Sequence, residues 1–205
     1  MARYYRLPLR LITQGKWLRI THGAKAVLPV LGMHADDNGV CWPGVKLIQE
    51  LTDLYHRDTI REATRSLISL DLIEKVRQGR RNVYYLKPPA ITVGKSYYPM
   101  SEEFIKTHWK SLSYVEKAVF GVLAVKAAIE DPDWPDVPEG INLPPWAERL
   151  ELGDDEDVFG HGEIQKKKWI RLAGVSFPSW NTAIEGLVNK DQIVLSGEND
   201  YIIRK

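Results

Sequence analysis

Residues 5–31 of this chain recur, without a gap, as residues 97–123. The matched positions include Tyr5 with Tyr97, Trp17 with Trp109, Thr21 with Ser113, and Lys25–Leu31 with Lys117–Leu123. A spacing held over this length indicates two copies of one module, and both copies must adopt related folds. The 205 residues suffice for two domains of about 100 residues, each with its own core. We therefore predict domains at residues 1–93 and 94–205.

The two predicted domains differ in charge. Residues 1–93 carry 15 Lys and Arg against 8 Asp and Glu, a net charge of +7. Residues 94–205 carry 13 against 19, a net charge of −6. Eleven of those carboxylates lie in residues 130–157, where Arg149 is the only Arg or Lys. This division indicates that a polyanion binds the first domain and does not bind the second in the same way.

Composition excludes several classes of protein. The single cysteine, Cys41, cannot form an internal disulfide and is typical of a reducing compartment. Residues 1–10 lack the apolar core of a signal peptide, and no apolar run approaches the roughly 20 residues that span a bilayer. We expect a cytoplasmic protein with no membrane partner.

The first domain reads as a winged helix-turn-helix. Apolar periodicity predicts helices over residues 24–35, 45–54 and 57–70, followed by strands over 72–77 and 82–86. Three helices with a short turn before the third, and then a two-stranded hairpin, form the order of this fold.

The third helix of this fold enters the major groove of DNA. Arg57, Arg61 and Arg65 are spaced four residues apart and share one face of that helix, with Thr59 and Thr64 as further hydrogen-bonding groups. The alternative to a DNA-reading helix is an ordinary solvated helix face, on which the arginines pair with carboxylates of the same helix.

Basic residues outside the third helix favour the DNA-binding interpretation. The hairpin tip carries Arg77, Gln78, Arg80 and Arg81, and Lys46 lies at the start of the second helix. Cations on both the third helix and the wing can reach bases and phosphates together. The predicted partner is double-stranded DNA.

Four stretches of the sequence carry a resemblance to a known family. They are AKAVLPVL, DDNGVCWPGVKLIQEL, LISLDLIEKVRQGRRNVYYL and the leading YYRLPLRLI with Trp17. Residues 21–86 thereby resemble the winged-helix domains of plasmid and phage replication initiators and related proteins of mobile elements. The resemblance implies the winged-helix fold and a part in replication. The family often has a serine after Trp-Pro; Gly44 stands there and lacks the side chain that would cap the next helix.

The second domain repeats this order with an insertion. Helices are predicted over residues 114–129, 164–174 and 178–189, and strands over 193–195 and 201–203. The proline-rich, acidic segment 131–162 separates its first two helices. The predicted fold is α+β and mainly helical, with two tandem winged helix-turn-helix domains, the second carrying this insertion.

The second domain lacks most of the basic surface. No Arg or Lys occurs between residues 177 and 189. Lys166, Lys167, Lys168 and Asn181 are possible secondary DNA contacts, although a solvated helix end is the alternative. We therefore expect this domain to bind protein, either a second copy of the chain or a replication protein.

No enzyme, cofactor or metal site is predicted. The five histidines lack ligand spacing, and no glycine-rich phosphate-binding motif or Ser/His/Asp grouping occurs. The leading hypothesis is a sequence-specific DNA-binding protein of a mobile element that acts as a replication initiator. The alternatives are a transcriptional repressor and an interaction protein in which residues 131–162 cover a partner's basic surface.

Overall fold

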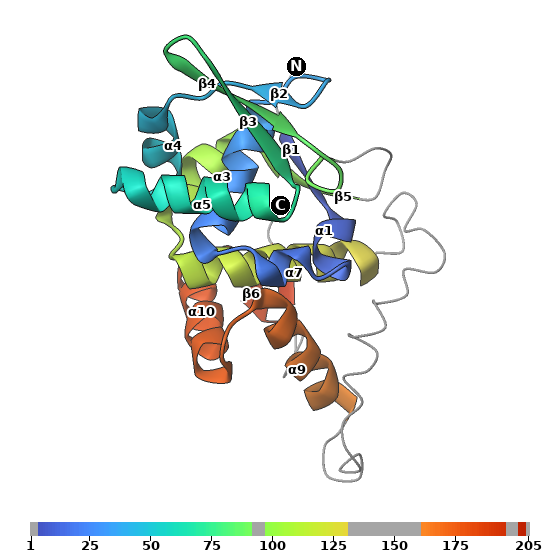
Figure 1. The fold of residues 1–205 in the computed structure, drawn as a ribbon. Helices are drawn as coiled ribbons and strands as arrows, with labels where there is room; N and C mark the ends of the chain where they lie inside the picture. The colour runs from blue at the N-terminus through green and yellow to red at the C-terminus, as the bar shows by residue number, and fades with distance from the viewer. Residues whose placement is uncertain (1–3, 92–96, 131–160, 196–200, 204–205) are drawn as a thin grey trace.

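The computed structural model describes residues 4–91, 97–130, 161–195 and 201–203. Most of the predicted insertion and the predicted domain boundary after residue 93 lie outside the described residues. The helices of residues 22–33 and 114–130 pack against each other at the centre, and a hairpin projects at one end (Figure 1). No described helix is long and apolar enough to cross a bilayer.

Residues 22–86 form the predicted helices and hairpin of the first repeat. They are α3 (His22–Met33), α4 (Val45–Thr52), α5 (Arg57–Ser69), β3 (Ile73–Gln78) and β4 (Arg81–Leu86). A short strand that was not predicted, β2 (Val40–Cys41), pairs with β4 and completes a sheet in the order β2-β4-β3. The Thr21 hydroxyl accepts a hydrogen bond from the Ala24 amide at 3.2 Å and so caps the beginning of α3. Gly44, at the same position before α4, provides no side-chain cap.

A two-stranded ribbon joins the beginnings of the two repeats, and it was not predicted. The first repeat opens with β1 (Tyr4–Pro8), α1 (Leu9–Thr13) and α2 (Lys16–Arg19), and the second with β5 (Tyr97–Ser101), α6 (Glu102–Phe104) and a π-helical turn, η1 (Ile105–Trp109). In the antiparallel β1–β5 pair, Tyr5 lies opposite Met100 and Pro8 opposite Tyr97. Tyr97 is the repeat counterpart of Tyr5, and Met100 that of Pro8. Exchanging the repeats therefore reproduces the same pairing, as a local two-fold axis requires.

Two tryptophans interlock the repeats in the same reciprocal way. The Trp17 indole N–H donates to the Ala118 carbonyl at 3.1 Å, and the Trp109 indole N–H donates to the Ala26 carbonyl at 3.1 Å. Both tryptophans are fully buried. Ala26 and Ala118 are themselves counterparts, on α3 and on α7 (Tyr114–Glu130), which pack against each other. Each repeat thus supplies part of the other's core.

The rest of the second repeat follows the predicted element order. It comprises α9 (His161–Ala173), α10 (Phe177–Asn189) and a hairpin of β6 (Ile193–Leu195) and β7 (Tyr201–Ile203). Asp71 and Asp191, which precede the two hairpins, both adopt positive φ, 53° and 60°. The same turn therefore leads from α5 into β3 and from α10 into β6.

Two buried lysines occupy matching positions at the contact between the repeats. The Lys25 ammonium donates to the Ala173 carbonyl at 3.0 Å, at the end of α9. The Lys117 ammonium donates to the Leu112 carbonyl. It also interacts electrostatically with the carboxylate of Asp53, at the end of α4. Burial lowers the pKa of Lys25 to about 8, and it lowers the pKa of Lys117 to about 8 as well.

The free energy of unfolding of this protein is expected to depend on pH in a way that a double variant, Lys25→Met with Lys117→Met, does not show. Between pH 8 and 10.5 the unfolded chain keeps both lysines protonated while the folded chain releases the protons. The free energy of unfolding of the wild type should therefore rise relative to that of the double variant over this window, on the order of 3 kcal/mol per lysine. Urea denaturation at successive pH values measures it, with the exposed Lys46→Met as control. Parallel curves for the wild type and the double variant would contradict the prediction.

Candidate nucleic-acid interface

Helix α5 is fixed against α3 by one apolar face. Ile60, Ala63 and Leu67 are buried there. The two helices lie close together near Gly23 on α3, where an added Cβ would make ordinary van der Waals contact with the Ala63 Cβ at 3.5 Å. The Thr21 amide also donates to the Ser66 hydroxyl at 3.0 Å. These contacts set which face of α5 is turned to solvent.

The three predicted arginines of α5 lie on the solvent face. Arg57, Arg61 and Arg65 are all exposed. Arg61 forms an ion pair with Asp58 at 2.9 Å, as the solvated-face alternative expects, but its side chain remains 62% exposed. Exposed pairs of this kind contribute about 0–1 kcal/mol. A phosphate or a guanine edge can therefore replace Asp58 at little cost, and Arg61 stays available.

The prediction that Thr64 contacts DNA is wrong. Thr64 is only 3% exposed, and its hydroxyl donates to the Ile60 carbonyl at 2.7 Å. It lies four residues after Ile60 and three before Leu67, so it shares their buried face. Thr59 is half-buried, with its methyl group facing Gly23.

The wing hairpin separates the predicted cations onto two faces. Side chains alternate along strands, so Lys75 and Arg77 share one face of β3 while Val76 and Gln78 share the other. The Lys75 ammonium lies 5.8 Å from the ring centre of Tyr84, which is buried in the core below the sheet. Lys75 and Arg77 therefore lie on the α5 side of the sheet.

The remaining predicted wing residues lie elsewhere. Arg81 pairs in register with Gln78, so both belong to the opposite face of the sheet. Arg80 occupies the turn beside Gly79, between the two strands. The four residues predicted as one hairpin tip thus divide between two faces and a turn.

Lys75 is a member of the basic surface that the sequence reasoning missed. Its pKa is lowered, first by burial and then by the charges of Arg61 and Arg77. Lys75 belongs to wing strand β3 and lies on its α5 side, near enough for the charge of Arg61 on α5 to act on it, so the cations of α5 and of the wing form one basic surface. The sequence could have identified it, because side chains alternate along a strand and residue 75 therefore lies on the same face as Arg77.

The other predicted contacts lie apart from α5 or pair locally. Lys46 is exposed on α4 and lies 3.8 Å from Glu50. The Lys166 ammonium lies 5.1 Å from the ring centre of Phe177. Lys167 is exposed, and Lys168 and Asn181 are half-buried, on α9 and α10. These two helices lie at the end of the molecule opposite the β3–β4 hairpin, so the fold does not bring them to the α5 surface (Figure 1).

Comparison with known proteins agrees with this geometry. Residues 18–73 match the family model of a helix-turn-helix domain, a segment that contains α3, α4 and α5. The chain thus contains a helix-turn-helix domain, to which the β3–β4 hairpin adds a wing. No curated protein and no solved structure matches the chain. Within the described residues, no cluster of His, Cys, Asp and Glu is suited to a metal ion.

Proposed function

We propose that this protein binds double-stranded DNA sequence-specifically, with α5 in the major groove and the wing on the adjoining phosphates or minor groove. The observation that carries the proposal is the continuous basic surface from Arg57, Arg61 and Arg65 to Lys75 and Arg77. Arginine is the side chain most often used to read guanine, and fixed cations on a wing position the helix. The match to a helix-turn-helix domain supports the same conclusion.

Binding of the intact protein to duplex DNA across a salt series tests this proposal. Fluorescence anisotropy between about 50 and 200 mM salt should show affinity falling steeply, because phosphate contacts release counterions. A protein that binds no duplex at low salt would contradict the proposal and leave α5 as an ordinary solvated face.

Replacing Lys75 with alanine is expected to lower the slope of log affinity against log salt by about one. The reason is that Lys75 is exposed on wing strand β3, on the side that faces α5, where it can contact one phosphate. The affinity for all sequences should fall alike, since a phosphate contact carries no base information. Arg10→Ala, which removes an exposed cation from α1, provides the control. A slope unchanged by Lys75→Ala would remove this residue from the interface.

The biological role that we propose is replication initiation on a mobile element, with transcriptional repression as the alternative. The resemblance of residues 21–86 to initiator domains supports it. Selection from random duplexes would supply the bound sequence. Plasmids that carry the selected sequence should then replicate only when the protein is present. Repression of an adjacent promoter without replication would favour the repressor instead.

We also infer that residues 97–203 form a second winged helix that contacts protein. The order of α7, α9, α10 and the β6–β7 hairpin supports this inference, as does the exposure of Leu195 (54%) and Phe177 (51%). No Arg or Lys lies on α10 to attract phosphate. Sedimentation equilibrium of the wild type and Leu195→Asp tests self-association. A monomer at all concentrations would exclude the homodimer and direct attention to a different partner.

A further inference from the structure

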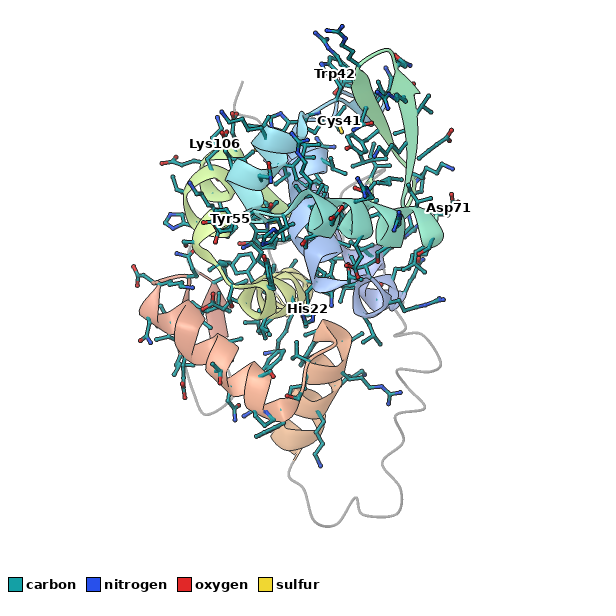
Figure 2. The ribbon with its side chains drawn as sticks, turned by 60° about the vertical axis from the view of Figure 1, so that its left-hand side comes forward. His22, Cys41, Trp42, Tyr55, Asp71 and Lys106 are labelled. Carbon is teal, nitrogen blue, oxygen red and sulfur yellow. The ribbon has the colours of Figure 1, made fainter. Side chains whose placement is uncertain are left out.

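The face of the wing sheet turned away from α5 has its own chemistry. Val40, Val83 and Tyr85 lie on this face, because they alternate along their strands with the core residues Cys41 and Tyr84. A shallow hollow opens there, with the following residues around it: Val40, Trp42, Gln78, Arg81, Val83 and Tyr85. Figure 2 shows Trp42 beside the hairpin, at the outer end of the molecule. The wing thus has a cationic inner face and an aromatic outer face.

Trp42 is 57% exposed, although the neighbouring Cys41 is fully buried. Core packing therefore does not explain a tryptophan at this position. Other exposed aromatic side chains have partners within the protein: Tyr4 stacks with Tyr97 and Phe177 lies beneath Lys166. Within the described part of the chain, the Trp42 indole has no ring, cation or hydrogen-bond partner, so its face is free to accept one.

The polar groups around Trp42 indicate the class of ligand. Arg81 and Gln78 line the hollow together with Trp42 and Tyr85, and the Gln78 amide nitrogen donates to the Tyr85 hydroxyl at 3.4 Å. An aromatic platform with flanking cations and an amide suits an unpaired nucleobase, which stacks on the ring while the cation meets its phosphate. A purely apolar protein side chain would gain little from Arg81 and Gln78. The positive charge of Arg81 and the amide of Gln78 therefore favour a nucleic acid over a protein partner.

We propose that this hollow binds a base of an unpaired DNA strand next to the duplex site, with the base stacked on Trp42. This inference rests on the proposed function, because α5 and the inner face of the wing hold the duplex. A strand that leaves the duplex at the hairpin passes Arg80 in the turn and reaches Arg81 and Trp42 on the far face. One wing then contacts paired DNA on one side and unpaired DNA on the other.

The test compares a blunt duplex with the same duplex carrying a single-stranded tail of about six thymidines, a length within the reach of small single-strand sites. The tail should raise the affinity of the wild-type protein roughly 5- to 150-fold, the range expected for one stacked base. Trp42→Ala should abolish this gain and leave the affinity for the blunt duplex unchanged, and Trp42→Phe should retain part of it. Phe177→Ala removes an aromatic side chain of similar exposure from α10 and should keep the full gain.

Other results separate the possible failures. A tail that adds no affinity to the wild type, or a Trp42→Ala variant that keeps the full gain, overturns the stacking proposal and leaves the hollow as a contact for protein. An equal loss on blunt and tailed DNA also overturns it, because Trp42 would then serve duplex binding. Absence of any duplex binding by the wild type would instead contradict the proposed function. In that case, binding of oligothymidine alone that Trp42→Ala loses would still support the single-strand site.

Discussion

Replacing Arg57, Arg61 and Arg65 together with alanine is expected to lower the affinity for a selected duplex at least about 100-fold. Each arginine that makes a bidentate base contact contributes about 1–3 kcal/mol. All three side chains are exposed on the face of α5 opposite its packing against α3. Anisotropy titration at fixed salt, with the far-ultraviolet circular dichroism spectrum as a check of folding, measures the loss.

The matched control for this experiment removes three arginines from another part of the surface. Arg10, Arg19 and Arg171 are exposed on α1, α2 and α9, so their replacement by alanine changes the net charge equally. This control variant should lose only the weak, long-range part of the attraction. Equal losses in the two triple variants would show that α5 does not read the DNA and that charge alone governs binding.

Replacing either interlocking tryptophan with alanine is expected to lower the free energy of unfolding by about 3–5 kcal/mol. Trp17 and Trp109 are fully buried, and each donates a hydrogen bond across the contact between the repeats. Such a loss is a large fraction of the stability of a typical domain, about 5–15 kcal/mol. Urea denaturation followed by circular dichroism measures it, with Trp42→Ala as the exposed control.

The same experiment examines whether the two repeats unfold together. Because each repeat completes the other's core, one cooperative transition is expected for the whole chain. Two separate transitions, with Trp17→Ala affecting only one of them, would show that the repeats are independent. Removing residues 94–205 would expose the buried face of Trp17, so DNA binding is better studied in the intact protein.

Much of the fold follows from local patterns in the sequence. The helices α3, α4 and α5 and both hairpins were predicted from apolar periodicity and turn residues, signals that act within a few positions. The β1–β5 ribbon was missed because its strands are separated by almost half of the chain, and pairing at that distance leaves no local periodicity. The reciprocal hydrogen bonds of Trp17 and Trp109 across the contact between the repeats were missed for the same reason. The repeat in the sequence showed only that the two residues occupy matching positions.

The candidate site was predicted in outline and refined by tertiary structure. The arginine spacing on α5 identified the exposed stripe, because helical periodicity is a local property. Thr64 was assigned wrongly, although its spacing from Ile60 and Leu67 already placed it on the buried face of α5. Lys75 and the two faces of the wing depend on which side of the hairpin faces α5, and that orientation is set by the core beneath Tyr84.

The two-fold relation between the repeats bears on the kind of DNA sequence that the chain can read. A symmetric pair of identical heads recognises a palindrome. Here the exchange of repeats preserves the ribbon and the tryptophan contacts, whereas the first repeat is basic and α10 carries no Arg or Lys. We therefore expect a bound sequence with a direction, which one chain reads from a single head. Copies of such a sequence in tandem would orient successive protein molecules the same way along the DNA.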